Sequence, residues 1–374
     1  MKFICSKTQL TDIINTVQKA VMAKSTNPIL ECIKIDADAH GNLVFTGNNM
    51  DLCIEYHADC NIPEGGTIAL NSKMFGDFVR KLPDGDVTVE VNEENNVTKI
   101  QCERSEINIE GLEPNEFPTA PEFDGKYNFA INQIELKKII RQTIFAAATS
   151  LVKPILTGML FEIDGNNLTV VTLDGARLAL RKCSIEGSDK SYKFVVPGNT
   201  LRELLKILKD DESKVDIKVS DKHCLFNFGD FKVITRLLEG EYLNYKPLLS
   251  TQNTVEVIVE TRTLAESLER TALLLSDEAV QKAKKPVKIR IGFEKMEINC
   301  LTAKGSIHDV IPVSIKGDDM EIGFNYKYLL EALKATEEDT VKLEMSSPNA
   351  SCFIRAVDDK DEYAYIVQPI RLRV

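Results

Sequence analysis

The sequence predicts an α+β protein built from three copies of one module, each with two strand–helix–strands halves. Two observations predict this fold class. A strand that leads into a helix recurs at intervals of 126 and 128 residues, and further strands and a second helix follow each copy in the same order. The chain has 374 residues, 43% of them hydrophobic and 28% charged. That length suffices for about two to four globular domains.

The three copies begin with strand-like segments around Phe3, Phe129 and Val257. Apolar residues at the spacing of an amphipathic helix follow the first two starts, and a helix is expected after the third as well. A proline then opens a run of alternating, largely β-branched residues, which is typical of strands. These runs occupy residues 28–35, 154–161 and 286–291.

Each copy continues with a second half that has its own strand and helix. Proline, glycine and polar residues at 111–118 and 238–245 follow the first two copies and are typical of linkers. We therefore expect domains at residues 1–120, 127–246 and 254–374. The strands of the second halves are expected at 67–70, 193–196 and 321–324, and their helices at 72–82, 199–208 and 326–335.

Charge is distributed unevenly along the chain. The net charge of −11 argues against nucleic-acid binding, for which a basic domain is the usual signature. However, each of the six predicted helical segments is positive, and together they carry +11, which leaves −22 for the rest. Lysines favoured at helix C-termini account for one or two such segments, whereas six indicate a shared surface that faces something anionic. Any contact with DNA would therefore be to phosphate and independent of base sequence. The segments are 7–24, 72–81, 134–153, 198–209, 263–288 and 327–334.

The sequence lacks the common catalytic and cofactor motifs. We find no Walker loop, no Gly-x-Gly-x-x-Gly and no Gly-x-Ser-x-Gly. Nine dispersed cysteines without a Cys-x-x-Cys pair predict reduced thiols in a cytoplasmic protein, and four scattered histidines show no metal-ligand spacing. No apolar run approaches the roughly 18–20 residues that span a bilayer. We therefore expect no catalytic residue, cofactor, metal or membrane contact.

Two other classes of function stay open on the sequence. An acidic run at Asp358, Asp359, Asp361 and Glu362 would suit a metal-dependent nuclease or nucleotidyltransferase, although Lys360 within it favours a solvated loop. A peptide-binding scaffold without any DNA contact is the other alternative.

The chain resembles the β subunit of bacterial DNA polymerase III, the β sliding clamp family, over its whole length. The resemblance implies a head-to-tail homodimer in which six modules form a ring, with helices lining the hole and sheets on the rim. It further implies a non-catalytic processivity factor that encircles double-stranded DNA and tethers the replicative polymerase. The segments that carry the resemblance most specifically are 158–162, 174–179, 320–325 and 369–372.

The resemblance also implies a hydrophobic pocket that captures short linear motifs of the polymerase, the clamp loader and repair proteins. Leu173, Ala176, Leu243 and Gln368 stand where the family usually has threonine, histidine, proline and methionine, which leaves the motif preference open. By position, the pocket comprises Leu156, Leu173, Gly175, Arg177, Leu178, Pro247, Leu248, Asn325, Tyr328, Gln368, Pro369, Ile370 and Arg371.

Two further sets of residues complete the expectations. At the dimer interface, the resemblance places Ile107 and Ile109 of one chain against Leu274 and Leu275 of the other. The charged segments and the resemblance together suggest phosphate contacts by Lys24, Lys73, Arg80, Lys138, Arg141 and Lys285.

Overall fold

The computed structural model describes residues 1–38, 41–121, 123, 125–187, 190–250, 252–275, 286–358 and 362–372. The chain folds into two compact units. The first comprises residues 1–134 and 206–237, and the second comprises residues 135–205 and 238–374. The division falls inside the second repeat, because each half of that repeat joins the sheet of a different neighbouring repeat.

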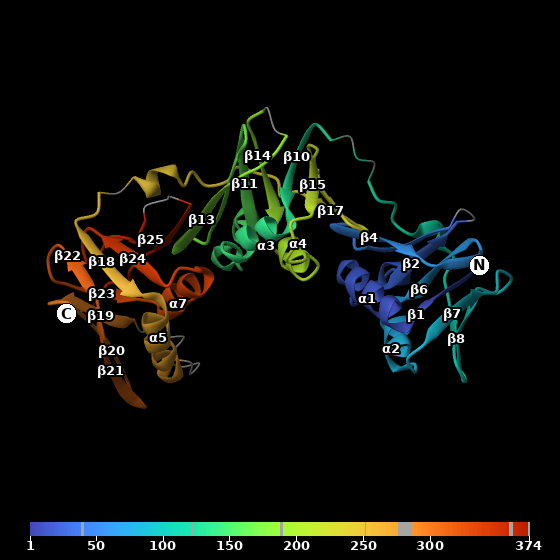
Figure 1. Ribbon diagram of the computed structural model, residues 1–374, viewed down its shortest axis with the longest axis horizontal. Coiled ribbons are helices and arrows are strands. Elements are labelled where there is room, and N and C mark those ends of the chain that lie inside the picture. Colours follow the sequence, from blue (N-terminus) through green and yellow to red (C-terminus); the bar gives the residue numbers. More distant parts are fainter. Residues whose placement is uncertain are drawn as a thin grey trace. The chain divides into compact units, whose positions relative to one another are not determined.

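The first unit contains two antiparallel sheets (Figure 1). Its strands are β1 (Lys2–Ser6), β2 (Cys32–Ala37), β3 (Asn42–Asn48), β4 (Leu52–Asp59), β5 (Asn61–Glu64), β6 (Gly66–Asn71), β7 (Asp86–Val91), β8 (Val97–Cys102), β9 (Ser105–Glu110), β10 (Tyr127–Asn132), β15 (Lys214–Val219), β16 (His223–Phe228) and β17 (Phe231–Arg236). One sheet has the order β5-β1-β7-β8-β9, and the other has the order β10-β15-β16-β17-β4-β3-β2-β6.

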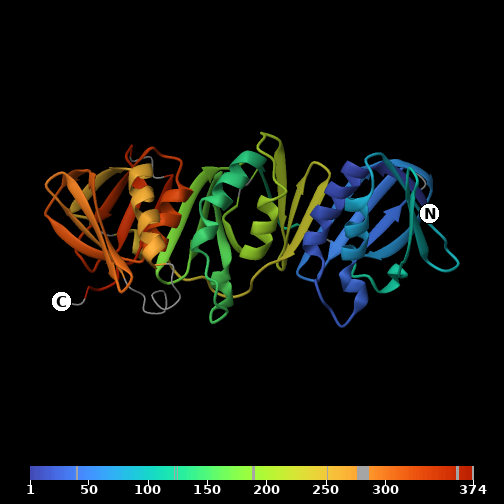
Figure 2. The same ribbon diagram turned by 90° about the horizontal axis from the view of Figure 1, so that it is seen from below.

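Two helices of the first unit, α1 (Lys7–Val17) and α2 (Ser72–Lys81), lie side by side in both views (Figures 1 and 2). Each begins at a side-chain cap, because the oxygens of Ser6 and Asn71 accept hydrogen bonds from backbone N–H groups of the first turn. Helix α1 buries Leu10, Ile13, Ile14 and Val17, whose spacing places them on one face.

The second unit also contains two antiparallel sheets. Its strands are β11 (Gly158–Asp164), β12 (Asn167–Leu173), β13 (Arg177–Ser184), β14 (Tyr192–Pro197), β18 (Val255–Glu260), β19 (Val287–Gly292), β20 (Lys295–Thr302), β21 (Gly305–Pro312), β22 (Ser314–Lys316), β23 (Met320–Phe324), β24 (Thr340–Met345), β25 (Cys352–Ala356) and β26 (Tyr363–Val367). They form the sheets β14-β11-β12-β13-β26-β25-β24-β18-β22 and β21-β20-β19-β23.

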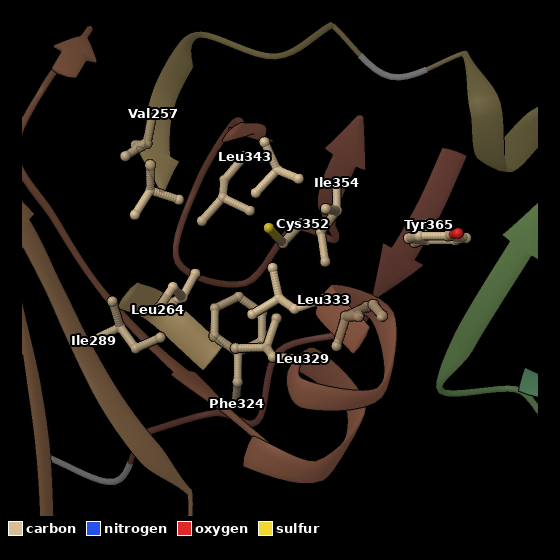
Figure 3. Packing of buried hydrophobic residues seen from close by; sticks show 14 of the residues in the cluster. Val257, Leu264, Ile289, Phe324, Leu329, Leu333, Leu343, Cys352, Ile354 and Tyr365 are labelled. Atoms are coloured by element: carbon tan, nitrogen blue, oxygen red, sulfur yellow. The ribbon is translucent and has the colours of Figure 1, made fainter. Parts of the chain in front are cut away.

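The helices of the second unit are α3 (Gln133–Arg141, from Glu135 onward in this unit), α4 (Gly198–Leu205), α5 (Thr261–Leu275) and α7 (Tyr326–Ala335). In the third repeat, Leu264 of α5 and Leu329 and Leu333 of α7 point into one core against the strands (Figure 3). The helices in the described part of the chain are too short or too polar to cross a membrane.

Sheets continue from one repeat into the next by edge-to-edge pairing. In the first unit, β4 pairs with β17 so that Leu52 lies opposite Thr235. In the second unit, β13 pairs with β26 so that Arg177 lies opposite Val367. Leu52 and Arg177 are the first residues of β4 and β13, the last strands of the first halves of repeats one and two. Each of these first halves therefore extends the sheet of the following repeat's second half, and the register is the same in both cases.

Three helices end earlier than the sequence predicts. Helices α2 and α7 end at Lys81 and Ala335, within one residue of the prediction, but α1 ends at Val17, α3 at Arg141 and α4 at Leu205. Several of the positive charges that the sequence assigns to helices therefore lie in the turns that follow. Helices α1, α4 and α5 carry no net charge, whereas α2 and α3 each carry +2 and α7 carries +1.

Two predicted strand starts are also wrong. Residues Pro28–Glu31 and Pro154–Thr157 form single 3-10 turns, and strands β2 and β11 begin only after them. Proline suits the first position of such a turn, where a backbone N–H would have no partner within the turn. It suits a strand less well, because it cannot donate a hydrogen bond to the ladder. The predicted second-half strands at 67–70, 193–196 and 321–324 are confirmed as parts of β6, β14 and β23.

The end of α1 packs directly against the backbone of β3. A Cβ atom on Gly47 would lie only 2.4 Å from the carbonyl oxygen of Val17. The equivalent position of the second repeat holds Thr172, whose hydroxyl donates a hydrogen bond to the carbonyl of Thr143 just beyond α3. At the same position, the first repeat makes room for the helix-end carbonyl with a glycine, and the second repeat binds the carbonyl with a hydroxyl group.

Gly47→Ala should destabilise the first unit by about 1–3 kcal/mol, because the added methyl group requires helix and strand to separate. Urea unfolding followed by circular dichroism measures this loss. Val44→Thr, a nearly isosteric change at a half-buried position of the same strand, should cost less than about 1 kcal/mol. Equal losses for both variants would contradict the close approach as the cause.

Candidate functional site

Arg177, at the start of β13, connects the second and third repeats inside the second unit. Its side chain is only 10% exposed and forms ion pairs with Asp174, at 3.0 Å, and with Glu331 of α7. Its guanidinium carbon also lies 4.5 Å from the ring centroid of Tyr328. Because the planar guanidinium can pair with carboxylates and stack on a ring at once, one side chain orients both repeats here.

The turn before Arg177 positions several of the predicted pocket residues. The carboxylate of Asp174 accepts hydrogen bonds from the backbone N–H groups of Ala176, at 2.9 Å, and Arg177, at 3.1 Å. Gly175, between Asp174 and Ala176, has a φ of +92°, a conformation that favours glycine, and open space around its Cα. The turn therefore places Arg177 while leaving its own outer side free.

The C-terminal segment is fixed beside this turn. The backbone N–H of Gln368 donates to the carbonyl of Ala176 at 2.8 Å, and that of Ile370 donates to the carbonyl of Gly323 at 2.8 Å. Gln368 is exposed, whereas Pro369 and Ile370 are half-buried. Asn325 caps α7 through a hydrogen bond from the N–H of Lys327, at 3.1 Å.

Three of the predicted leucines form the apolar base of the site. Leu156, Leu173 and Leu178 are 6%, 3% and 2% exposed, and they share one buried cluster with Tyr242 and Ile366. They therefore belong to the core of the second unit as well as to the predicted pocket. Among these cluster members, sequence analysis missed Tyr242 and Ile366.

A hollow of about 250 Å³ opens above Leu156. Leu243 of its lining is an exposed apolar side chain, and the exposed Leu151 and Val152 directly precede Lys153 of the lining in the sequence. A hollow with apolar side chains in its lining can accept an aliphatic or aromatic side chain of a partner. Its lining residues are Lys153, Ile155, Leu156, Glu241, Tyr242, Leu243 and Asn244.

The remaining predicted pocket residues are less closely connected. Pro247 and Leu248 lie exposed on the 3-10 turn Lys246–Leu249, of which Leu249 packs against the buried cluster. Arg371 is exposed. Sequence analysis also missed Glu331, because nothing in a local pattern pairs it with Arg177, which lies 154 positions earlier.

A second, larger hollow of about 1300 Å³ lies along β11 to β14 and was not predicted. Its lining is mostly polar and includes Lys182 and Lys193, as well as Glu162, which accepts a hydrogen bond from the hydroxyl of Tyr245. That pairing and burial raise the pKa of Tyr245. Three residues of its lining, Leu180, Tyr245 and Leu249, belong to or pack against the same buried cluster as the leucines at the base of the site.

The predicted DNA contacts fall into two groups. Lys24 and Lys73 are exposed, and neither forms an ion pair within the described ranges. Arg80 pairs with Asp77 at 2.8 Å, and Lys138 and Arg141 both pair with Glu337, the former at 2.9 Å. The hydrogen bond from Lys138 holds the pKa of Glu337 below its ordinary value. Lys285 lies outside the described residues.

The predicted dimer residues differ in accessibility. Ile109 and Leu275 are buried in their own chain, whereas Ile107 and Leu274 are half-buried. Leu274 lies beside β21, 3.6 Å from the place a Cβ on Gly305 would occupy. Leu273, which sequence analysis did not single out, is 79% exposed.

The acidic run near the C-terminus is only partly described. Asp359 and Asp361 lie outside the described residues, and Glu362 pairs with Arg181 at 3.4 Å. In the part of the chain that the structure covers, no group of three or more histidine, cysteine or carboxylate side chains could hold a metal ion.

Comparison with known proteins covers the chain from end to end. Residues 1–121, 130–244 and 246–371 match the N-terminal, central and C-terminal domains of the DNA polymerase III beta subunit. The beta sliding clamp of Halalkalibacterium halodurans is 32% identical over 385 residues, covering 99% of this chain and 100% of that protein.

Solved structures agree with these matches. The DNA polymerase sliding clamp of Bacillus subtilis has a TM-score of 0.94 and 32% identity, with 100% of both chains covered. A DNA polymerase III beta subunit from Eubacterium rectale has a TM-score of 0.92 and 38% identity, with 99% of both chains covered.

Arg177→Ala should destabilise the second unit by about 1–3 kcal/mol, because it leaves two largely buried carboxylates without their partner. Arg177→Lys should recover only part of that loss, since lysine cannot fork between carboxylates or stack. Urea unfolding measures both. Arg371→Ala, at an exposed position of the same site, should stay within about 0.5 kcal/mol of the unchanged chain; a loss as large as that of Arg177→Ala would refute the assignment.

Proposed function

This chain belongs to the DNA polymerase III β subunit family, the β sliding clamps, and we propose that two copies close into a ring around duplex DNA. The ring holds the replicative polymerase on its template without catalysing a reaction. Retention is topological, because a closed ring leaves circular DNA only when an interface opens. One observation carries the proposal: β9 and β21 are edge strands of the described sheets, although their counterparts in the other repeats pair with each other.

The repeat architecture supports pairing of these two edges between chains. Inside the chain, the last strand of one repeat's first half pairs with the last strand of the following repeat. Strand β4 pairs in this way with β17, and β13 with β26. Two equivalent strands have no such partner among the described strands. They are β21, in the first half of the third repeat, and β9, at the end of the second half of the first repeat. Their pairing is head-to-tail, so two copies close a ring through two identical contacts.

The internal ladders also predict the register of this interface. If Gly305 takes the place of Leu52, it faces Ile109, and Ile307 then faces Ile107. His308 comes to lie opposite Glu106, at the position where Lys232 and Glu55 pair at 3.9 Å inside the first unit. The accessibility of these residues agrees with that register, because Ile107 and Ile307 are half-buried while Glu106 and His308 are exposed.

Apolar side chains reinforce the same edge. Leu274, near the end of α5, lies beside β21, and its exposed neighbour Leu273 offers the apolar area that the buried Leu275 does not. Burying such side chains against Ile107 of the partner would stabilise the contact by roughly 1.5–3 kcal/mol per fully buried residue.

Contacts with DNA in this proposal are phosphate contacts by lysine and arginine. Lys24 and Lys73 are available at once, since they are exposed and carry no ion pair within the described ranges. Lys138 and Arg141 are engaged with Glu337, so phosphate has to replace a carboxylate there. Such contacts are weak and independent of base sequence, which suits a ring that slides.

Partner proteins, in this proposal, bind through a short segment with apolar anchors. The hollow above Leu156 takes one anchor, with the exposed Leu243 in its lining, and the exposed Leu248 offers further apolar surface to the segment. Polar groups at Asn325, Gln368 and Arg371 fix the orientation of the segment. The clamp loader, the polymerase and repair proteins would compete for this site.

The register predicts one efficient cross-link between chains. Asn108 and Ser306 are both exposed and should lie opposite each other, so Asn108→Cys combined with Ser306→Cys should give covalent dimers on oxidation. The matched control, Glu110→Cys with Ser306→Cys, displaces one thiol by two residues and beyond the usual span of a disulfide. Non-reducing gel electrophoresis measures the yield, and equal yields for both pairs would refute the register.

The same variant tests encirclement. We expect the Asn108→Cys, Ser306→Cys chain, oxidised after incubation with nicked circular plasmid, to stay on the DNA through a detergent wash. Cutting the plasmid with a restriction enzyme should then release it. Lys24→Glu with Lys73→Glu should lower the amount captured, whereas Lys218→Glu on β15 should not. Covalent dimers that wash off circular DNA as readily as off linear DNA would rule out the ring.

A further inference from the structure

Cys5 and Cys60 face each other in the first unit. Ile4 of β1 pairs with Asn61 of β5 in an antiparallel ladder. One further step in the same register, just before β5 begins, places Cys5 opposite Cys60. The irregularity of this ladder lies on the other side of Ile4 and does not separate the two cysteines. Opposed residues of antiparallel strands have Cα atoms about 4.5–5.5 Å apart, within the roughly 4.4–6.8 Å that a disulfide spans.

The two thiols also interact directly. A hydrogen bond between them raises the pKa of Cys5, to which burial adds, and lowers the pKa of Cys60. Cys60 is half-buried, whereas Cys5 is 6% exposed. Cys60 is therefore the thiol that a reagent from solution meets first and in its more reactive form.

The pair occupies a structural crossing point. Strand β4 ends at Asp59 in the eight-stranded sheet, and β5 begins at Asn61 in the five-stranded sheet, so Cys60 joins the two sheets. Cys5 precedes Ser6, the N-cap of α1. A covalent bond between the cysteines would fix the start of α1 to this crossing.

We propose that Cys5 and Cys60 form a reversible cross-strand disulfide whose oxidant is a small disulfide such as glutathione disulfide. The Cys60 thiolate attacks one sulfur of the oxidant, forms a mixed disulfide and releases one small thiol. Cys5 then attacks Sγ of Cys60 and expels the second small thiolate, which takes up the proton that Cys5 loses and leaves as a thiol. Two protein thiols are oxidised, and one small disulfide is reduced to two thiols.

Other cysteines of the same repeat lack this arrangement. Cys53 of β4 is buried, and its burial, with Glu55 nearby, raises its pKa to about 12. A thiol held protonated in the core does not attack a disulfide in solution. Cys53 therefore serves as the matched control for the reaction.

The test treats the native full-length chain with glutathione disulfide, blocks the remaining thiols with an alkylating agent and maps the peptides by mass spectrometry. We expect one cross-linked peptide pair joining Cys5 to Cys60, with the loss of two hydrogen atoms and reversal by dithiothreitol. Cys53→Ser should retain it. Cys5→Ser should instead accumulate glutathione on Cys60, because the second attack is lost, and Cys60→Ser should acquire neither modification.

Thermal unfolding provides a second readout on the unchanged chain. Because a disulfide restricts the unfolded chain, the oxidised protein should unfold at a temperature higher by several degrees, and reduction should abolish the difference. A lasting mixed disulfide on Cys60 in the unchanged chain, or full alkylation of both thiols after treatment, would overturn the proposal. Neither result depends on whether the chain encircles DNA.

Discussion

Backbone hydrogen bonding between strands of different repeats holds this chain together. The pairing of β4 with β17 and of β13 with β26 satisfies N–H and C=O groups that would otherwise stand at exposed sheet edges. It also explains why the compact units do not coincide with the repeats, since each half of the second repeat is bonded to a different neighbour. The helices and the candidate site are positioned by those ladders.

The site around Arg177 depends on the second of these ladders. Arg177 is the residue at which β13 meets the last residue of β26, so its side chain stands where two repeats join. Glu331 and Tyr328 reach it from the third repeat, and Asp174 from the second. A site built this way is only as rigid as the strand pairing beneath it, so the proposed binding of partners would depend on the integrity of the sheet.

Much of the fold could be predicted from the sequence, because the order of strands and helices is encoded locally and repeated three times. The ends of α1 and α3 could not, since the apolar spacing continues into the 3-10 turns Gln18–Ala20 and Ile144–Ala146. The resemblance supplied Arg177 and the leucines of the site. Glu331 and Tyr242 escaped because contacts between distant positions leave no periodic signal. Register across the ladders is likewise absent from any single strand.

Glu337 has a consequence for how the chain responds to its ionic surroundings. Its carboxylate pairs with both Lys138 and Arg141 and offsets one of their two charges. An anion that binds these cations therefore exchanges with a group of the protein and displaces fewer ions from solution. Affinity for polyanions depends on salt in proportion to the counterions released. The chain should therefore lose affinity for polyanions with rising salt less steeply than its number of basic residues suggests. It can keep its phosphate contacts weak and still retain positive side chains.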